Sequence, residues 1–275
     1  MTQLATPTPP VALPEEPVRG RRRTASAVAW PLLGLVVTIA TWWIVVQLLA
    51  VNTVVLPSPP DVVDGFNRYR ELLIEQTWYT AKASVLGFGI SVVVGVLLGV
   101  AIAAWRPFER MFQPLLVAFN AVPKVALAPL MLIWFGYGQT PILAMAFMVC
   151  FFPIVLSTAT GLTSTPADLA ELVKSMDASR LQTFVRVRLP AALPQIFVGL
   201  KVAMPLAVIG VVVGEMQYGE SGLGTIIVQT SGQGDTSTAF AAITLLALIS
   251  IVLYYVLVLV ERLALPWVRA TTSQR

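Results

Sequence analysis

Three ionisable side chains lie within long apolar stretches of the sequence and are the first candidates for chemistry. Lys124 lies in one stretch, and Lys201 and Glu215 lie in another. A charge in apolar surroundings is costly unless it meets a counter-charge, a polar backbone group or water. We therefore expect Lys124 to attract an anion, to pair with Glu215, or to brace a proline-distorted helix through free carbonyl groups. Lys201 lies close enough to the end of its stretch for its side chain to reach water.

Several kinds of catalytic and metal site are excluded by the residue types. The chain has no histidine and one cysteine, Cys150. Zinc sites built on histidine and Ser–His or Cys–His catalysis are therefore excluded. Cys150 cannot form an internal disulfide and is expected to be a small core residue. The sequence lacks the Gly-x4-Gly-Lys-Ser/Thr phosphate loop, so we expect this chain not to bind or split ATP itself. We also expect no catalytic residue, no metal and no cofactor in this chain.

Composition indicates that lipid covers much of the surface. Of the 275 residues, 57% are hydrophobic and 12% are charged, and the mean hydropathy is +0.80. A soluble domain has about 25% charged residues. Only helices and closed barrels satisfy their backbone hydrogen bonds in hydrocarbon, and a barrel would show alternating segments of about ten residues. The long unbroken apolar runs therefore predict an all-α, polytopic membrane protein surrounded by membrane lipid.

Six apolar runs are predicted to be transmembrane helices. Residues 1–26 are Pro-rich and then Arg-rich, and are predicted to be a disordered cytoplasmic tail. Basic residues gather in the segments that six spans place on the same side as this tail, so both termini are expected in the cytoplasm and the chain in the cell's inner (plasma) membrane. Because the charge of +4 lies at the ends of these runs, it does not indicate a nucleic-acid partner. The predicted membrane domain is 27–268, with spans at 27–51, 83–105, 112–135, 140–160, 194–216 and 238–260, a cytoplasmic loop at 161–193 and a tail at 269–275.

The second predicted span carries a small residue at every fourth position. On a helix these residues form one shallow face that permits close approach of a neighbouring backbone. The face is expected either to pack within the subunit or to serve as a sliding or dimer surface. Its members are Ala83, Gly87, Ser91, Gly95, Gly99 and Ala103.

Two segments between the spans begin with helix-capping signals. Ser58 as N-cap, Pro59 and Asp61 predict an outer helix that continues to about Ile74. In the loop 161–193, a first short helix is predicted after Thr165, with one apolar stripe along it. Ser179 and Gln182 predict a capping box for a second short helix, which is expected to stop at Leu189-Pro190.

The two loop helices have two possible roles. Amphipathic helices of this kind can lie on the lipid surface. Two helices with a sharp corner can equally dock into a groove of a soluble partner.

The loop resembles the EAA loop of ABC importer permeases. That pattern is Glu-Ala-Ala, three residues, Gly, nine residues, Ile, one residue and Leu-Pro. This chain has Glu171-Leu172-Val173, then Asp177, and then Val187-Arg188-Leu189-Pro190 at the same spacing. Asp177 replaces the glycine, which would allow a left-handed backbone at the bend. The shape of the corner depends on whether Asp177 adopts that conformation.

The resemblance extends over roughly residues 30–268. The segments that carry it are similar to those of the nitrate/sulfonate/taurine group of these permeases. They are Leu56-Pro57-Ser58-Pro59, the Gly-rich second span, Pro123-Lys124-Val125-Ala126-Leu127-Ala128-Pro129-Leu130, Trp134-Phe135-Gly136, Gly214-Glu215, Gly222-Leu223-Gly224 and Glu261-Arg262.

The resemblance implies a type I ABC importer permease fold with six transmembrane helices and cytoplasmic coupling helices. It implies three kinds of partner: two copies of a separate ABC ATPase, which carry the ATP and Mg, an extracytoplasmic solute-binding protein, and a second permease copy in a homodimer. Glu171 is expected to make a polar contact with the ATPase, although it could instead form an ordinary pair with Lys174. The residues expected to couple to the ATPase are Asp168, Leu169, Glu171, Leu172, Val173, Met176, Asp177, Phe184, Leu189 and Pro190.

The cargo that the resemblance implies is a small sulfonate- or nitrate-like anion. The same importer role for a vitamin precursor, such as a thiamine pyrimidine or riboflavin, is the first alternative. A stand-alone secondary transporter is the alternative from another class, but it would need intramembrane acids in the span interiors for a coupling ion. The residues expected along the pathway are Lys124, Trp134 and Glu215.

Overall fold

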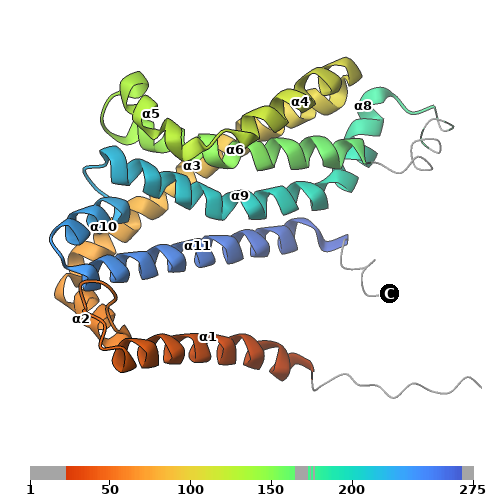
Figure 1. Ribbon diagram of the computed structural model, residues 1–275. Coiled ribbons are helices and arrows are strands. Elements are labelled where there is room, and N and C mark those ends of the chain that lie inside the picture. Colours follow the sequence, from red (N-terminus) through yellow and green to blue (C-terminus); the bar gives the residue numbers. More distant parts are fainter. Residues whose placement is uncertain (1–22, 165–172, 174, 176, 268–275) are drawn as a thin grey trace, which may run out of the picture. The chain divides into compact units, whose positions relative to one another are not determined.

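The computed structural model describes residues 23–164, 173, 175 and 177–267. Within these ranges the chain is helical and contains no strand, which confirms the predicted all-α fold (Figure 1). The elements are α1 (Arg23–Leu48), α2 (Pro59–Arg68), α3 (Arg70–Ala104), α4 (Arg106–Ala121), the 3-10 helix η1 (Lys124–Leu127), α5 (Ala128–Phe135), α6 (Gln139–Thr163), α8 (Arg180–Thr183), the π-helix η2 (Phe184–Arg188), α9 (Leu189–Tyr218), α10 (Leu223–Gly232) and α11 (Thr236–Ala264).

The predicted spans agree with the long apolar helices. Among the described residues, five helices are long and apolar enough to cross a membrane, and there are six if the bent pair of α4 with η1 and α5 is one span. The first candidate span, Ala29–Leu48, belongs to a separate unit that ends at Ala50. Its helix, α1, begins at Arg23, within the predicted tail 1–26. The remaining helices, from α2 onwards, belong to the second unit.

The core of the second unit is built around α6, which packs between α3 and α9 (Figure 1). The small residues of α3 make this possible. A Cβ added at Gly87 would lie 2.5 Å from the Cβ of Ala146, and one added at Gly99 would lie 2.6 Å from the Cβ of Thr158. The small-residue face therefore packs within the subunit, against α6.

The third predicted span, at 112–135, is broken within its length. The two parts meet at an angle of 81°. Val122, which precedes Pro123, is extended with φ −68° and ψ 127°. A proline disfavours the helical state of the residue before it and supplies no N–H of its own. The break therefore follows from Pro123.

The predicted outer helix is shorter than expected. Its cap is confirmed, because the carboxylate of Asp61 accepts from both the backbone N–H and the hydroxyl of Ser58. The helix ends at Arg68, however, and Arg70 already begins α3. Gly65 lies against the backbone of Ser237, so α2 packs on the first turn of α11.

Candidate functional site

The predicted coupling loop lies at one end of the helical bundle, together with α8 (Figure 1). We call this the α8 end. The opposite end carries α2 and α10, and we call it the α10 end. The structure describes Val173, Asp177, Phe184, Leu189 and Pro190 of the predicted coupling residues. The others, Asp168, Leu169, Glu171, Leu172 and Met176, lie outside the described residues.

Asp177 forms the corner of the loop. Its φ of +54° lies in the left-handed region, which glycine adopts most readily and which Asp tolerates better than most residues. The backbone N–H of Ala178 donates to the carbonyl of Val173 over 3.4 Å. This is the long-range bond of a Schellman motif, in which the left-handed residue ends a helix. The replacement of glycine by Asp177 therefore preserves a glycine-type corner.

The second loop helix begins as predicted. The backbone N–H of Ser179 donates to Oε1 of Gln182 over 3.0 Å, and the backbone N–H of Gln182 donates to the hydroxyl of Ser179 over 3.3 Å. These reciprocal bonds confirm the capping box. The corner and the cap together fix the direction in which α8 leaves the bend.

The predicted stop at Leu189-Pro190 is wrong, because α8, η2 and α9 follow one another without leaving helical geometry. Thr183, Arg188 and Leu189 all have right-handed helical dihedral angles. The backbone N–H of Leu189 donates to the carbonyl of Phe184, five residues earlier. Such a widened turn accommodates Pro190, since the ordinary four-residue ladder is already interrupted there. The loop therefore continues directly into the fifth span.

The apolar residues of the loop divide into inward and outward sets. Phe184 and Leu189 pack against the core cluster of α6 and α9. Leu181 of α8 is 72% exposed and Val185 of η2 is 50% exposed, four residues apart in the sequence. The ATPase contact of Phe184 stays a prediction, and Leu181 and Val185 are two further exposed apolar side chains beside it.

A second group of predicted residues lies at the break of the third span. Nζ of Lys124 donates to Oδ1 of Asn120 over 2.8 Å and lies 5.2 Å from the ring centre of Phe152. A cavity of about 270 Å³ adjoins these residues. Trp134 lies farther along, on α5, and is 60% exposed. The cavity is lined by Leu116, Asn120, Phe152, Pro153, Leu156, Ser157 and Val202.

Glu215 is buried in a network at the α10 end. Its Oε1 accepts from the hydroxyl of Thr80 over 2.8 Å, and its Oε2 accepts from the backbone N–H of Gly224 over 2.9 Å. The hydroxyl of Thr80 in turn accepts from the N–H of Leu223. Lys124 and Glu215 thus have different partners, and the pair that the sequence allowed is not formed. Glu215 would have to leave these bonds to touch a cargo.

An ion pair that sequence reasoning missed joins α9 to α11. Nζ of Lys201 lies 2.9 Å from each carboxylate oxygen of Glu261. The sequence predicted that Lys201 reaches water, but a counter-charge lies within its reach. The available signal was Glu261, an acid at the end of an apolar run that six spans bring to the same end of the bundle as Lys201.

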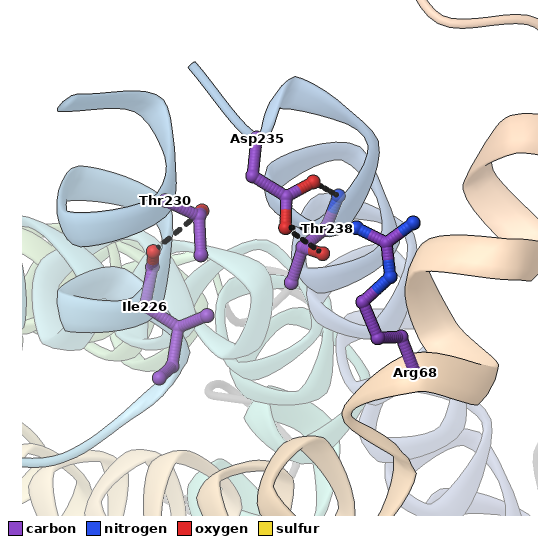
Figure 2. A network of polar contacts seen from close by, with 5 residues as sticks. All are labelled: Arg68, Ile226, Thr230, Asp235 and Thr238. Carbon is purple, nitrogen blue, oxygen red and sulfur yellow. Dashed lines mark hydrogen bonds and ion pairs between the residues drawn. The ribbon is translucent and has the colours of Figure 1, made fainter. Parts of the chain in front are cut away.

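A further polar cluster lies at the α10 end (Figure 2). Asp235 caps α11 by accepting from the backbone N–H and the hydroxyl of Thr238, over 3.2 and 2.7 Å. The guanidinium of Arg68 lies 3.8 Å from the same carboxylate. In α10, the hydroxyl of Thr230 donates to the carbonyl of Ile226. The cluster ties the end of α2 to the start of α11.

Known proteins are similar to this chain over most of its length. Residues 91–270 match the family described as binding-protein-dependent transport system inner membrane component. The riboflavin transport system permease protein RibX of Chloroflexus aurantiacus is 36% identical over 93% of this chain and 97% of its own length. The formylaminopyrimidine transport permease protein ThiX of Halalkalibacterium halodurans is 34% identical, covering 86% and 95%. The taurine transport system permease protein TauC of Escherichia coli is 28% identical, covering 85% and 87%.

A solved structure shares the fold. An inward-facing form of the MetNI methionine ABC transporter superposes with a TM-score of 0.62 at 20% sequence identity. The match covers 71% of this chain and 97% of that chain. The helices described here thus have the arrangement of a type I ABC importer permease.

Proposed function

The chain belongs to the family of binding-protein-dependent transport system inner membrane components, and on that premise we propose that its loop couples a separate ATPase to the import of a small organic anion. The chain is the membrane-spanning permease subunit of an ABC importer. The ATPase contact, the number of copies and the identity of the cargo are the parts of this proposal that go beyond family membership.

One observation carries the ATPase contact: in the part described from Asp177 on, the loop has a capped left-handed corner and then continues as helix from Arg180 into the fifth span. Asp177 and the Ser179–Gln182 capping box fix the corner. Because η2 and α9 continue α8 without an interruption, a displacement of α8 moves α9. Leu181 and Val185 supply exposed apolar surface for a groove on the ATPase. Glu171 supplies the polar contact.

The assembly proposed around this chain follows from its membrane orientation. The α8 end and both termini face the cytoplasm, where the ATPase subunits bind. The α10 end faces outward and receives a solute-binding protein. Two copies of this chain enclose the pathway, and two ATPase subunits bind ATP and Mg. The bias of basic residues toward the segments at the α8 end supports this orientation.

The proposed cargo is a small sulfonate-like anion, and a specific observation favours a second candidate. Lys124 supplies a positive charge beside a cavity, and the taurine permease is a relative. The riboflavin and formylaminopyrimidine permeases have higher identities, 36% and 34%. A vitamin or vitamin precursor is therefore the second candidate.

The coupling proposal is tested by purification of the tagged chain from gently solubilised native membranes. Wild type is expected to bring down a nucleotide-binding ATPase, and Glu171→Ala is expected to recover less of it. Glu75→Ala, an exposed acid on α3 toward the α10 end, is the matched control and should recover as much as wild type. If no ATPase accompanies the wild-type chain even after cross-linking, the coupling proposal is wrong.

The cargo is tested on the solute-binding protein recovered in the same experiment. Its thermal midpoint is measured with taurine, with riboflavin and with formylaminopyrimidine. A rise with taurine supports the anion. A rise with one of the other two compounds and none with taurine replaces the anion by a vitamin-type cargo.

A further inference from the structure

A cavity lies halfway along the helices that cross the membrane. Phe152 and Pro153 contribute to it from the middle of α6, and Val202 contributes from the middle of α9. Leu116 and Asn120 contribute from α4, just before the break at Val122. Irregular backbone at membrane depth occurs where it is buried in protein or lines a water-filled cavity. The broken backbone at Val122 is therefore expected beside a cavity such as this one.

Lys124 brings a positive charge to the rim of this cavity. Within the described ranges, the ion pairs are Arg68–Asp235 and Lys201–Glu261, and the ammonium of Lys124 has no carboxylate partner there. Its contacts are the amide oxygen of Asn120 and the face of the Phe152 ring. An ammonium has three donors, and one of them is used by Asn120. Within the described part of the chain, Asn120 holds the ammonium and no carboxylate neutralises its charge.

An uncompensated charge at membrane depth is costly, and an anion relieves that cost. We propose that this cavity is a binding subsite for a small organic anion, whose charged end meets Lys124 and whose apolar end packs against Phe152 and Val202. Asn120 positions the ammonium, and the hydroxyl of Ser157 is a further polar group on the wall.

The size of the cavity limits the ligand. Its volume of about 270 Å³ lies just below the usual range of roughly 300–1,000 Å³ for sites that bind drug-sized molecules. A short sulfonate or carboxylate therefore fits this volume. The role of this subsite in transport rests on the proposed importer function, but binding of the anion requires neither ATP nor the ATPase.

The subsite is tested by protection of a cysteine placed on its wall. Ser157→Cys is made together with Cys150→Ala, which removes the chain's one native cysteine. Alkylation by N-ethylmaleimide is followed in membranes that contain the full chain with its partners and no added ATP. The probes are ethanesulfonate and its uncharged analogue ethyl methyl sulfone. Ethanesulfonate is expected to slow alkylation several-fold, and the sulfone is expected to have no effect.

Two lysine variants decide whether the charge of Lys124 is responsible. Lys124→Met is expected to abolish protection by ethanesulfonate, and Lys124→Arg, which keeps the charge, to retain protection. Lys82→Met is the matched control, since Lys82 also lies over an aromatic ring, 5.1 Å from the centre of Trp78, but away from the cavity. It should leave protection unchanged.

Three results would overturn the subsite: no protection by ethanesulfonate, equal protection by the sulfone, or protection that persists in Lys124→Met. None of these results bears on co-purification of the ATPase, so the subsite and the importer proposal can fail separately.

Discussion

At the scale of single residues, Asp177 shows how a polar side chain can replace glycine at a corner. The left-handed region costs an ordinary L-residue about 1–2 kcal/mol. Asp and Asn visit it more readily because their short side chains bond locally. Asp177 is exposed, so its effect comes from backbone conformation and not from burial.

Substitutions at Asp177 should therefore follow backbone preference. Asp177→Gly is expected to keep or raise the thermal midpoint of the purified chain and to keep ATPase recovery. Asp177→Val is expected to lower both, because a β-branched residue is strained at φ +54°. Ala178→Val, one residue beyond the corner, is the control. Equal behaviour of the Gly and Val variants would contradict a left-handed corner.

Glu215 is expected to stabilise the α10 end through its two accepting oxygens. Glu215→Ala leaves the buried N–H of Gly224 without its acceptor, and an unsatisfied buried donor costs about 1–3 kcal/mol. The thermal midpoint should fall, and Thr80→Val should add little once Glu215 is removed, because both belong to one network. Glu220→Ala, a nearby exposed acid, is the control. A midpoint unchanged by Glu215→Ala would show that the network contributes no stability.

At the scale of helices, the close contact of α3 with α6 depends on which face of α3 a glycine occupies. Gly87→Ala is expected to destabilise the chain by about 1–3 kcal/mol, since its Cβ would meet Ala146. Gly89→Ala is the matched control, because nothing lies within 4 Å of its Cβ, and alanine favours a helix by about 1 kcal/mol. Thermal melting in detergent compares the two. Equal melting points would rule out the close packing at Gly87.

The pair of Lys201 and Glu261 ties α9 to α11. Lys201→Glu is expected to place two acids in contact and to lower stability by more than about 1.5–3 kcal/mol, the usual contribution of a hydrogen bond to a charged group. Lys201→Glu combined with Glu261→Lys restores opposite charges and should recover most of the loss. The measurement is the thermal midpoint of all three variants. A double variant that melts like Lys201→Glu alone would contradict a direct pair.

The sequence predicts a helix start well where the signal comes from neighbouring residues. It predicts poorly those helix ends and side-chain partners that depend on packing between helices. The capping boxes at Ser58 and Ser179 depend on residues three positions apart, so they can be found without a fold. The effect of proline depends on its surroundings. Pro123 breaks the third span, whereas the helix continues past Pro190 because the π-helix η2 precedes it. The Glu261 partner of Lys201 and the Phe152 contact of Lys124 come from helix packing, which the sequence alone does not specify.

At the scale of the whole molecule, α9 links the two ends of the bundle. At the α8 end it continues the loop through η2, and at the α10 end it presents Glu215 to the first turn of α10. A displacement of the loop therefore reaches the α10 end through one helix. The π-helix at Phe184–Arg188 is one point along this path where the regular ladder changes, and Pro194 and Pro205 interrupt it within α9.

Because this path starts at the loop surface, a change on that surface should disconnect the ATPase without unfolding the bundle. Val185→Asp is expected to reduce recovery of the ATPase with the tagged chain and to leave the thermal midpoint unchanged, since Val185 is already 50% exposed. Val63→Asp is the matched control: it lies on α2 at the α10 end, is 57% exposed, and should leave recovery intact. Equal recovery with both variants would place the ATPase contact away from Val185. If Val185→Asp alone lowers recovery of the ATPase, the surface around Val185 is the one through which the partner moves α9.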